Sequence, residues 1–167
     1  SSSIAIGNVI RQNPNAGELI SAGEAVNLVV SLGSNPAFVT TWDTSLGDGT
    51  TVTLALAGEV DATIDWGDGS DPNHVTTPGP HIHDYEVDGV YVVSVTGSVA
   101  AYNSYDNGSG DPWPEEAKLI SVNYWGRLGF TSMEVAFYNC SNLVSVPGTS
   151  NGIEAVTDMG NMFHGAS

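Results

Sequence analysis

Residues 61–98 carry the stretch DATIDWGDGSDPNHVTTPGPHIHDYEVDGVYVVSVTGS, which decides the fold of this chain. Apolar and polar residues alternate over residues 62–66, before a polar segment. After that segment two faces also alternate, with Val90, Val92 and Ser94 on one and Tyr91, Val93 and Val95 on the other. This alternation is typical of β-strands, and Gly67-Asp68-Gly69-Ser70 has the composition of a tight turn. The stretch therefore predicts strands of an all-β domain.

The segment before this stretch extends the same pattern. Strands are expected over residues 38–42 and 52–56, with a turn over residues 45–50 between them. We expect two sheets to pack face to face, with Val92 and the threonines pointing outward. The side chains expected between the sheets are Val52, Leu54, Leu56, Ile64, Trp66, Tyr91, Val93 and Val95.

Three marks in this region resemble the PKD domain, an immunoglobulin-like β-sandwich of cell-surface and secreted proteins. They are WGDGS at residues 66–70, HDY at residues 83–85 and the strand GVYVVSV at residues 89–95. The resemblance implies an Ig-like sandwich over residues 35–101, in which His83 has a structural role.

Residues 1–34 predict a short β-hairpin unit, because alternating segments flank the turn Asn13-Pro14-Asn15-Ala16-Gly17. Gln12, Pro14 and Ala16-Gly17, followed by VNLVVSLG at residues 26–33, resemble the second half of a PASTA unit. PASTA units are associated with cell-wall fragments. The plainer interpretation is a structural stalk.

Residues 118–167 contain an internal repeat. LISV at 119–122 recurs as LVSV at 143–146, and FTSM at 130–133 recurs as VTDM at 156–159. The second pair sets a period of about 26 residues, and a fixed period of this length predicts a solenoid. The pattern T-x-M-x-x-x-F-x-x-x-S resembles the BspA-type leucine-rich repeat of bacterial surface proteins.

The second copy of this repeat is incomplete, and a solenoid usually needs about three repeats to bury its apolar faces. We therefore expect further repeats or a partner chain to cover the last copy. Without such a cover, the end is expected to fray after about Gly148, or to self-associate through Met159, Met162 and Phe163.

The charge of the chain restricts its partners. Three basic residues stand against 19 acidic ones, which gives a formal net charge of −16. Nucleic acids and anionic membranes are expected to be repelled.

The single cysteine, Cys140, excludes an intrachain disulfide. No apolar run approaches the ~20 residues of a transmembrane helix, and Ser1-Ser2-Ser3 begins no targeting segment, as expected of an excised or mature piece.

Two sets of residues are candidate metal ligands. Asp65, Asp68 and Asp71 lie around one turn, and carboxylate oxygens are the ligands that Ca²⁺ prefers. The alternative is that Asp68 only accepts backbone hydrogen bonds within the turn; residues 106–111, DNGSGD, are a weaker calcium candidate. His74, His81 and His83 form the second set, although the family resemblance gives His83 a structural role.

No catalytic group can be assigned from the sequence. Cys140 is expected to face the interior of the repeat, without a base beside it. Neither a G-x-S-x-G motif nor a phosphate-binding loop occurs. The chain is therefore expected not to be an enzyme.

Residues 102–117 form a predicted linker or loop rich in turn residues. Tyr102, Tyr105 and Trp113 are its candidate partner-binding residues, because exposed aromatic side chains commonly anchor interfaces. Trp125, by contrast, is expected to cap the core of the repeat.

Together these observations predict an extracellular or cell-surface protein of a bacterium, or of a virus of bacteria. The expected function is non-catalytic adhesion or recognition of a protein or glycan, with the sandwich as spacer and the repeat as binding face. One alternative is a structural subunit of a filament, sheath or virion, which packs against neighbouring copies. Another is an accessory domain of a secreted enzyme that degrades polysaccharide or protein.

Overall fold

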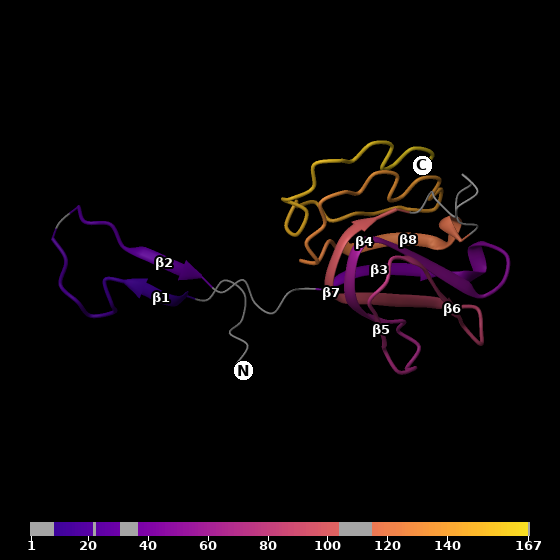
Figure 1. The fold of residues 1–167 in the computed structure, drawn as a ribbon, viewed down its shortest axis with the longest axis horizontal. Helices are drawn as coiled ribbons and strands as arrows, with labels where there is room; N and C mark the ends of the chain where they lie inside the picture. Colours follow the sequence, from indigo (N-terminus) through magenta and orange to yellow (C-terminus); the bar gives the residue numbers. More distant parts are fainter. Residues whose placement is uncertain (1–8, 22, 31–36, 104–114, 167) are drawn as a thin grey trace. The chain divides into compact units, whose positions relative to one another are not determined.

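The computed structural model describes residues 9–21, 23–30, 37–103 and 115–166, and the chain divides into two compact units (Figure 1). The first unit spans Ser1–Asn35 and the second spans Pro36–Ser167. The division falls one residue from the predicted boundary between residues 34 and 35. The described regular structure is almost entirely antiparallel β-strand, so the all-β prediction is confirmed.

The first unit is a two-stranded antiparallel ribbon of β1 (Val9–Asn13) and β2 (Asn27–Val30). Val9 pairs with Val30 and Asn13 pairs with Asn27, with one irregularity in register between Val9 and Arg11. The described apolar side chains of the ribbon, such as Leu28, are exposed. A lone ribbon of this kind is only marginally stable in water.

The second unit is built on a six-stranded antiparallel sheet in which the neighbours run β5-β4-β7-β3-β8, and β6 pairs with β4. Two single turns of 3₁₀ helix, η1 (Thr44–Leu46) and η2 (Glu116–Lys118), precede β4 and β8. The strands are β3 (Phe38–Asp43), β4 (Thr51–Asp65), β5 (Asn73–Val75), β6 (Gly79–Asp84), β7 (Val90–Tyr102) and β8 (Leu119–Tyr124).

The long strand β4 changes partners along its length. Its first part, Thr51 to Leu56, pairs with β6, and its last part pairs with β5 on one edge and β7 on the other. A bulge between Ala57 and Val60 separates the two parts. Bulges bend a strand and increase its twist, and β4 and β7 are visibly curved in Figure 1.

The alternation in the sequence predicts most of the apolar core of this sheet, but the expectation that its threonines point outward is wrong for Thr40 and Thr53, which are buried. Seven of the eight expected core residues are buried, Trp66 and Ile64 among them, and Val92 points outward as expected. The eighth, Tyr91, is only half-buried, because its ring stacks on Tyr85 near the surface at a centroid distance of 3.7 Å.

Beyond β8 the chain forms two stacked turns of coil. We call residues 131–139 the inner rung and residues 157–165 the outer rung. The amide of Thr157 donates to the carbonyl of Thr131 at 3.0 Å, and Ser132 and Asp158 form a parallel bridge. Segments that are one repeat period apart in sequence therefore lie side by side, as the repeat predicts.

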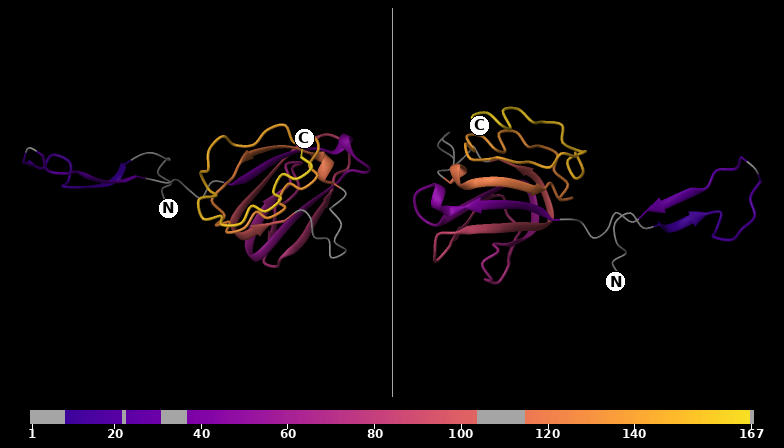
Figure 2. Two further views of the ribbon diagram at one scale, coloured as in Figure 1. Left: turned by 90° about the horizontal axis from the view of Figure 1, so that it is seen from above. Right: turned by 180° about the vertical axis from the view of Figure 1, so that it is seen from behind.

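The inner rung is itself stacked on the sheet. Ala101 at the end of β7 forms a parallel bridge with Ser132, and the amide of Thr131 donates to the carbonyl of Ala100 at 2.8 Å. On the other side of the coil, the amide of Val144 donates to the carbonyl of Ile120 in β8 at 3.0 Å. The coils thus continue the hydrogen bonding of β7 and β8, and they lie over one side of the strands (Figure 2).

Sheet and coils share one hydrophobic core. The ring of Phe38 in β3 lies 5.5 Å from both Tyr102 of β7 and Phe130 of the coil, and Phe137 lies 6.0 Å from Trp125. The two regions expected as a sandwich and a repeat therefore belong to a single compact unit. Among the described residues, no helix is long and apolar enough to cross a membrane.

Candidate functional site

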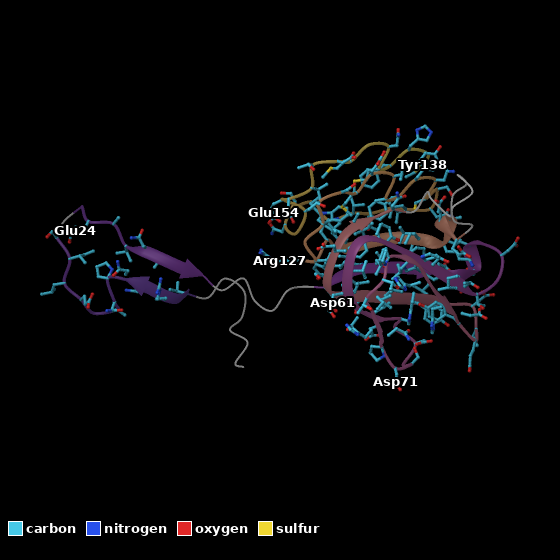
Figure 3. All side chains as sticks on the ribbon, viewed as in Figure 1. Glu24, Asp61, Asp71, Arg127, Tyr138 and Glu154 are labelled. Atoms are coloured by element: carbon cyan, nitrogen blue, oxygen red, sulfur yellow. The ribbon has the colours of Figure 1, made fainter. Side chains whose placement is uncertain are left out.

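The predicted calcium ligands do not assemble into a metal site. Asp65 Oδ1 accepts the amide of Gly67 at 3.0 Å, Asp68 is occupied by other partners, and Asp71 lies at the outer tip of the loop after β4 (Figure 3). Within the described ranges, no group of three or more His, Cys, Asp or Glu side chains is placed to hold a metal ion. The weaker candidate, residues 106–111, lies outside the described residues.

The three histidines also have separate partners. His74 Nε2 lies 2.8 Å from Asp61 Oδ1, His81 Nε2 lies 3.1 Å from the carbonyl of Thr77, and His83 Nε2 lies 2.7 Å from Asp68 Oδ2. His81 and His83 share one face of β6, as the alternation predicts. The set is not brought together around a common point.

His83 belongs instead to a network that fixes the turn after β4. Its imidazole stacks on Trp66 at a centroid distance of 4.9 Å and meets Tyr85 edge-on at 4.6 Å. The hydroxyl of Tyr85 donates to the Trp66 carbonyl at 2.8 Å, and burial raises the pKa of this phenol. Gly67 has a φ of 78°, and a side chain there would collide with the carbonyl of Val92.

Asp68 is the polar centre of this network. Its Oδ1 accepts from the hydroxyl of Ser70 at 2.6 Å and from the Ser70 amide at 3.0 Å. These bonds, together with the one from His83, hold the pKa of the Asp68 carboxyl well below its usual range. Because the Ser70 hydroxyl contacts Asp68 and not His83, the three side chains lack the serine–histidine hydrogen bond of a catalytic triad.

This geometry predicts an acid-sensitive contribution to stability. Because the pKa of Asp68 is lower in the folded protein, the ionised carboxylate stabilises the fold above the unfolded value of about 3.9. That stabilisation is lost as the pH falls from there through the folded pKa. Urea unfolding should therefore show Asp68→Asn to be less stable than wild type at pH 7, with a much smaller difference near pH 2. An equal difference at both pH values would contradict the assignment.

The prediction of Tyr102 as a surface residue was wrong. Tyr102 is buried, and its ring packs against Phe38 at 5.5 Å and Phe137 at 5.8 Å. The other two aromatic candidates, Tyr105 and Trp113, lie outside the described residues. Cys140 is buried in the coil, where burial raises the pKa of its thiol.

Apolar residues that are buried in the inner rung have exposed counterparts in the outer rung. Met133 and Phe137 of the inner rung are 0% exposed, whereas their counterparts one period later, Met159 and Phe163, are 46% and 42% exposed. Val144, on the other side of the same coil, is 85% exposed. Met162, expected on this surface, is instead buried beneath the outer rung.

We call this surface the end face. It includes a shallow hollow of about 260 Å³, and its lining residues are Leu143, Val144, Ser145, Val146, Phe163 and Ala166. Phe163 stacks on Phe137 beneath it at a centroid distance of 5.5 Å, so its ring is held in place with one side exposed. Exposed apolar surface of this kind makes the end face a candidate interaction site.

Comparison of the chain with known protein families, with characterised proteins and with solved structures found no match.

Proposed function

We propose that this chain is a non-catalytic recognition module that acts outside the cell and binds a partner protein through the end face of its coils. The observation that carries the proposal is the exposure of Met159, Phe163 and Val144 on a chain of net charge −16. Strong charge keeps such a chain soluble through self-repulsion. An exposed apolar face on it is therefore suited to a specific partner.

The sheet, the coils and the first unit have different roles in this function. The sheet is an Ig-like, PKD-like support, and the coils are leucine-rich repeats of the BspA type. The stacking of segments one period apart and the buried Met133 and Phe137 support the second assignment. The first unit is a PASTA-like stalk, for which the exposed ribbon of β1 and β2 is suitable.

An extracellular or cell-surface location, in a bacterium or a virus of bacteria, belongs to the same proposal. It rests on the sequence resemblances and on the acidic composition, which disfavours binding to nucleic acid and to anionic membranes. Ser70 and His83 each hydrogen-bond to Asp68 and not to one another, which supports a structural role for this network and not a catalytic one.

Adhesion of coated beads tests the proposal. Beads carrying wild type are expected to bind at least one member of a panel of immobilised extracellular proteins. The double variant Met159→Asp/Phe163→Asp should lose this binding by roughly tenfold or more, because central apolar residues dominate interface energies.

The matched control places the same two charges on exposed apolar residues elsewhere, as Val87→Asp/Val90→Asp. The control should bind like wild type. Equal binding by the end-face variant, or binding confined to a parallel panel of glycans, would overturn the proposal. Sedimentation of wild type addresses the assembly alternative, since a stable oligomer lost in the end-face variant would favour packing between copies.

A further inference from the structure

A threonine bonds each level of the coil stack to the level beneath it. The amide and the hydroxyl of Thr157 both donate to the carbonyl of Thr131, at 3.0 and 3.3 Å. One period earlier, the amide and the hydroxyl of Thr131 both donate to the carbonyl of Ala100, at 2.8 and 3.1 Å. Ala100 belongs to β7, so a strand of the sheet stands where a further rung would stand.

A column of close backbone contacts repeats this equivalence. Gly152 has a φ of 106°, and a Cβ there would collide with the carbonyl oxygen of Gly126. Gly126, one period earlier, has a φ of 69°, and a Cβ there would collide with the backbone nitrogen of Phe38 in β3. The first repeat therefore stacks on Phe38 as the second repeat stacks on Gly126.

Strand β8 belongs both to the sheet and to the first repeat. Its LISV segment is equivalent in sequence to LVSV at residues 143–146, and the amide of Val122 donates to the carbonyl of Ser145 at 2.9 Å. On its other side β8 pairs with β3, where Leu119 lies opposite Trp42. This pairing is antiparallel, whereas the repeats stack in parallel. Strand β3 is therefore not a repeat itself, but it takes the place of one.

The apolar side chains follow the same order. Phe163 packs on Phe137 at a centroid distance of 5.5 Å, and Phe137 packs in turn on Tyr102 of β7 at 5.8 Å. Phe130 packs on Phe38 of β3 at 5.5 Å. Phe130 and Phe137 are both 0% exposed, and without the sheet both would be uncovered. A stack of repeats requires a cover of this kind at its ends.

We propose that β3 and β7 are the amino-terminal cap of the coil stack, and that the first repeat folds only on this cap. Opening of the sheet then removes the base of the inner rung, and with it the outer rung that carries the end face. The sheet thereby acts as a conformational control on the end face. The inference goes beyond the proposed function, because it does not depend on what the end face binds.

Hydrogen exchange at the inner rung, after a change made within the sheet, tests this dependence. Trp66→Ala is the change, because the adjacent Gly67 contacts Val92 near the start of β7, whereas the coil stacks on Ala100 near its end. Amide exchange measured by NMR should then be roughly 100-fold faster or more at the inner rung, and faster by the same factor in β4 and β7, because they open together. Faster exchange in the sheet alone would overturn the inference.

The unmodified chain provides the same test should Trp66→Ala fail to fold. As urea is added, the amides of the inner rung and those of β4 and β7 should open with the same dependence on urea, since one opening exposes both. Inner-rung amides that open with a shallower dependence than the sheet amides would show that the coil opens by itself, which contradicts the inference.

A pair of glycine substitutions tests the contact between cap and coil. Gly126→Ala should speed exchange at the inner rung roughly tenfold more than Gly129→Ala, because the added methyl group collides with the backbone of Phe38. Gly129 is the matched control: its φ is 88°, and a Cβ there would meet no atom within 4 Å. Equal effects of the two substitutions would overturn the inference, whereas loss of bead adhesion alone would leave it standing.

Discussion

Replacing Trp66 with alanine will lower the free energy of unfolding of the larger unit by about 3–5 kcal/mol, the usual cost of removing a large aromatic side chain from a core. Trp66 is buried directly after β4, and its ring stacks on His83. Its indole Nε1 also donates to Asn73 Oδ1 at 2.7 Å, which leaves that amide oxygen without this donor in the variant.

Urea unfolding followed by far-UV circular dichroism measures this loss. Val92→Ala is the control, because Val92 is an exposed residue of the same sheet and its truncation should change stability by less than about 0.5 kcal/mol. A loss below about 1 kcal/mol for Trp66→Ala would show that the strand is in a different register, since a shift of one residue moves Trp66 to the outer face.

Lys118→Met is expected to cost on the order of 3 kcal/mol, because it removes a buried donor that three carbonyls share and leaves those carbonyls without it. Lys118 is 1% exposed, and its Nζ donates to the carbonyls of Asp48, Gly49 and Thr51 at 2.8 to 2.9 Å. Methionine fills nearly the same volume and donates nothing. The loop between η1 and β4 should loosen as a result.

Arg127→Met is the matched control for this substitution. Arg127 lies in the same unit and is half-exposed, so its replacement removes the same charge without burying an unpaired group. The control should lose less than about 1 kcal/mol, as surface charges usually do. Equal losses for the two variants would mean that net charge, and not the bonds of Lys118, determines the effect.

The sequence predicted the strands well where local patterning decides the structure. Alternation identified Trp66 and Val93 as buried and Val92 as exposed, because side chains on a strand point to opposite faces in turn. It did not identify Tyr102, since the turn-rich residues that follow made the tyrosine look like part of a loop. Tyr102 is the last residue of β7, and the coil covers it.

Contacts between distant segments account for most of what the sequence did not show. Lys118 reaches carbonyls 67 to 70 residues away, and a single lysine carries no signal of such a partner. The stacking of Ser132 on Ala101 joins the repeat to the sheet, although the repeat alone predicts only its own period. The calcium prediction rested on spacing, and the side chains of Asp65 and Asp68 instead bind backbone amides of their own turns.

The repeat predicted which apolar residues lie in the outer rung, but it did not predict the backbone conformation of the two rungs. The match of Phe137 to Phe163 located the apolar residues, because a period in sequence becomes a stack in space. Val135 and Asn161, equivalent residues of the two rungs, are both left-handed, with a φ of 52°. Valine disfavours that conformation, so local propensity argued against the geometry that the stack imposes.

Hydrogen exchange in the dilute, unmodified chain tests the central claim, that the outer rung is a formed but uncovered surface. The amides of Met133, Val135, Phe137 and Asn139 should be protected, because each donates to the outer rung. Fast exchange is expected at the amides of Met159, Asn161, Phe163 and Gly165. The amides of Met162 and His164 should stay protected, because each donates to a carbonyl of its own rung. Strong protection of both rungs in a monomer would mean that the end is already closed, and fast exchange of all six outer amides would mean that the outer rung is not formed.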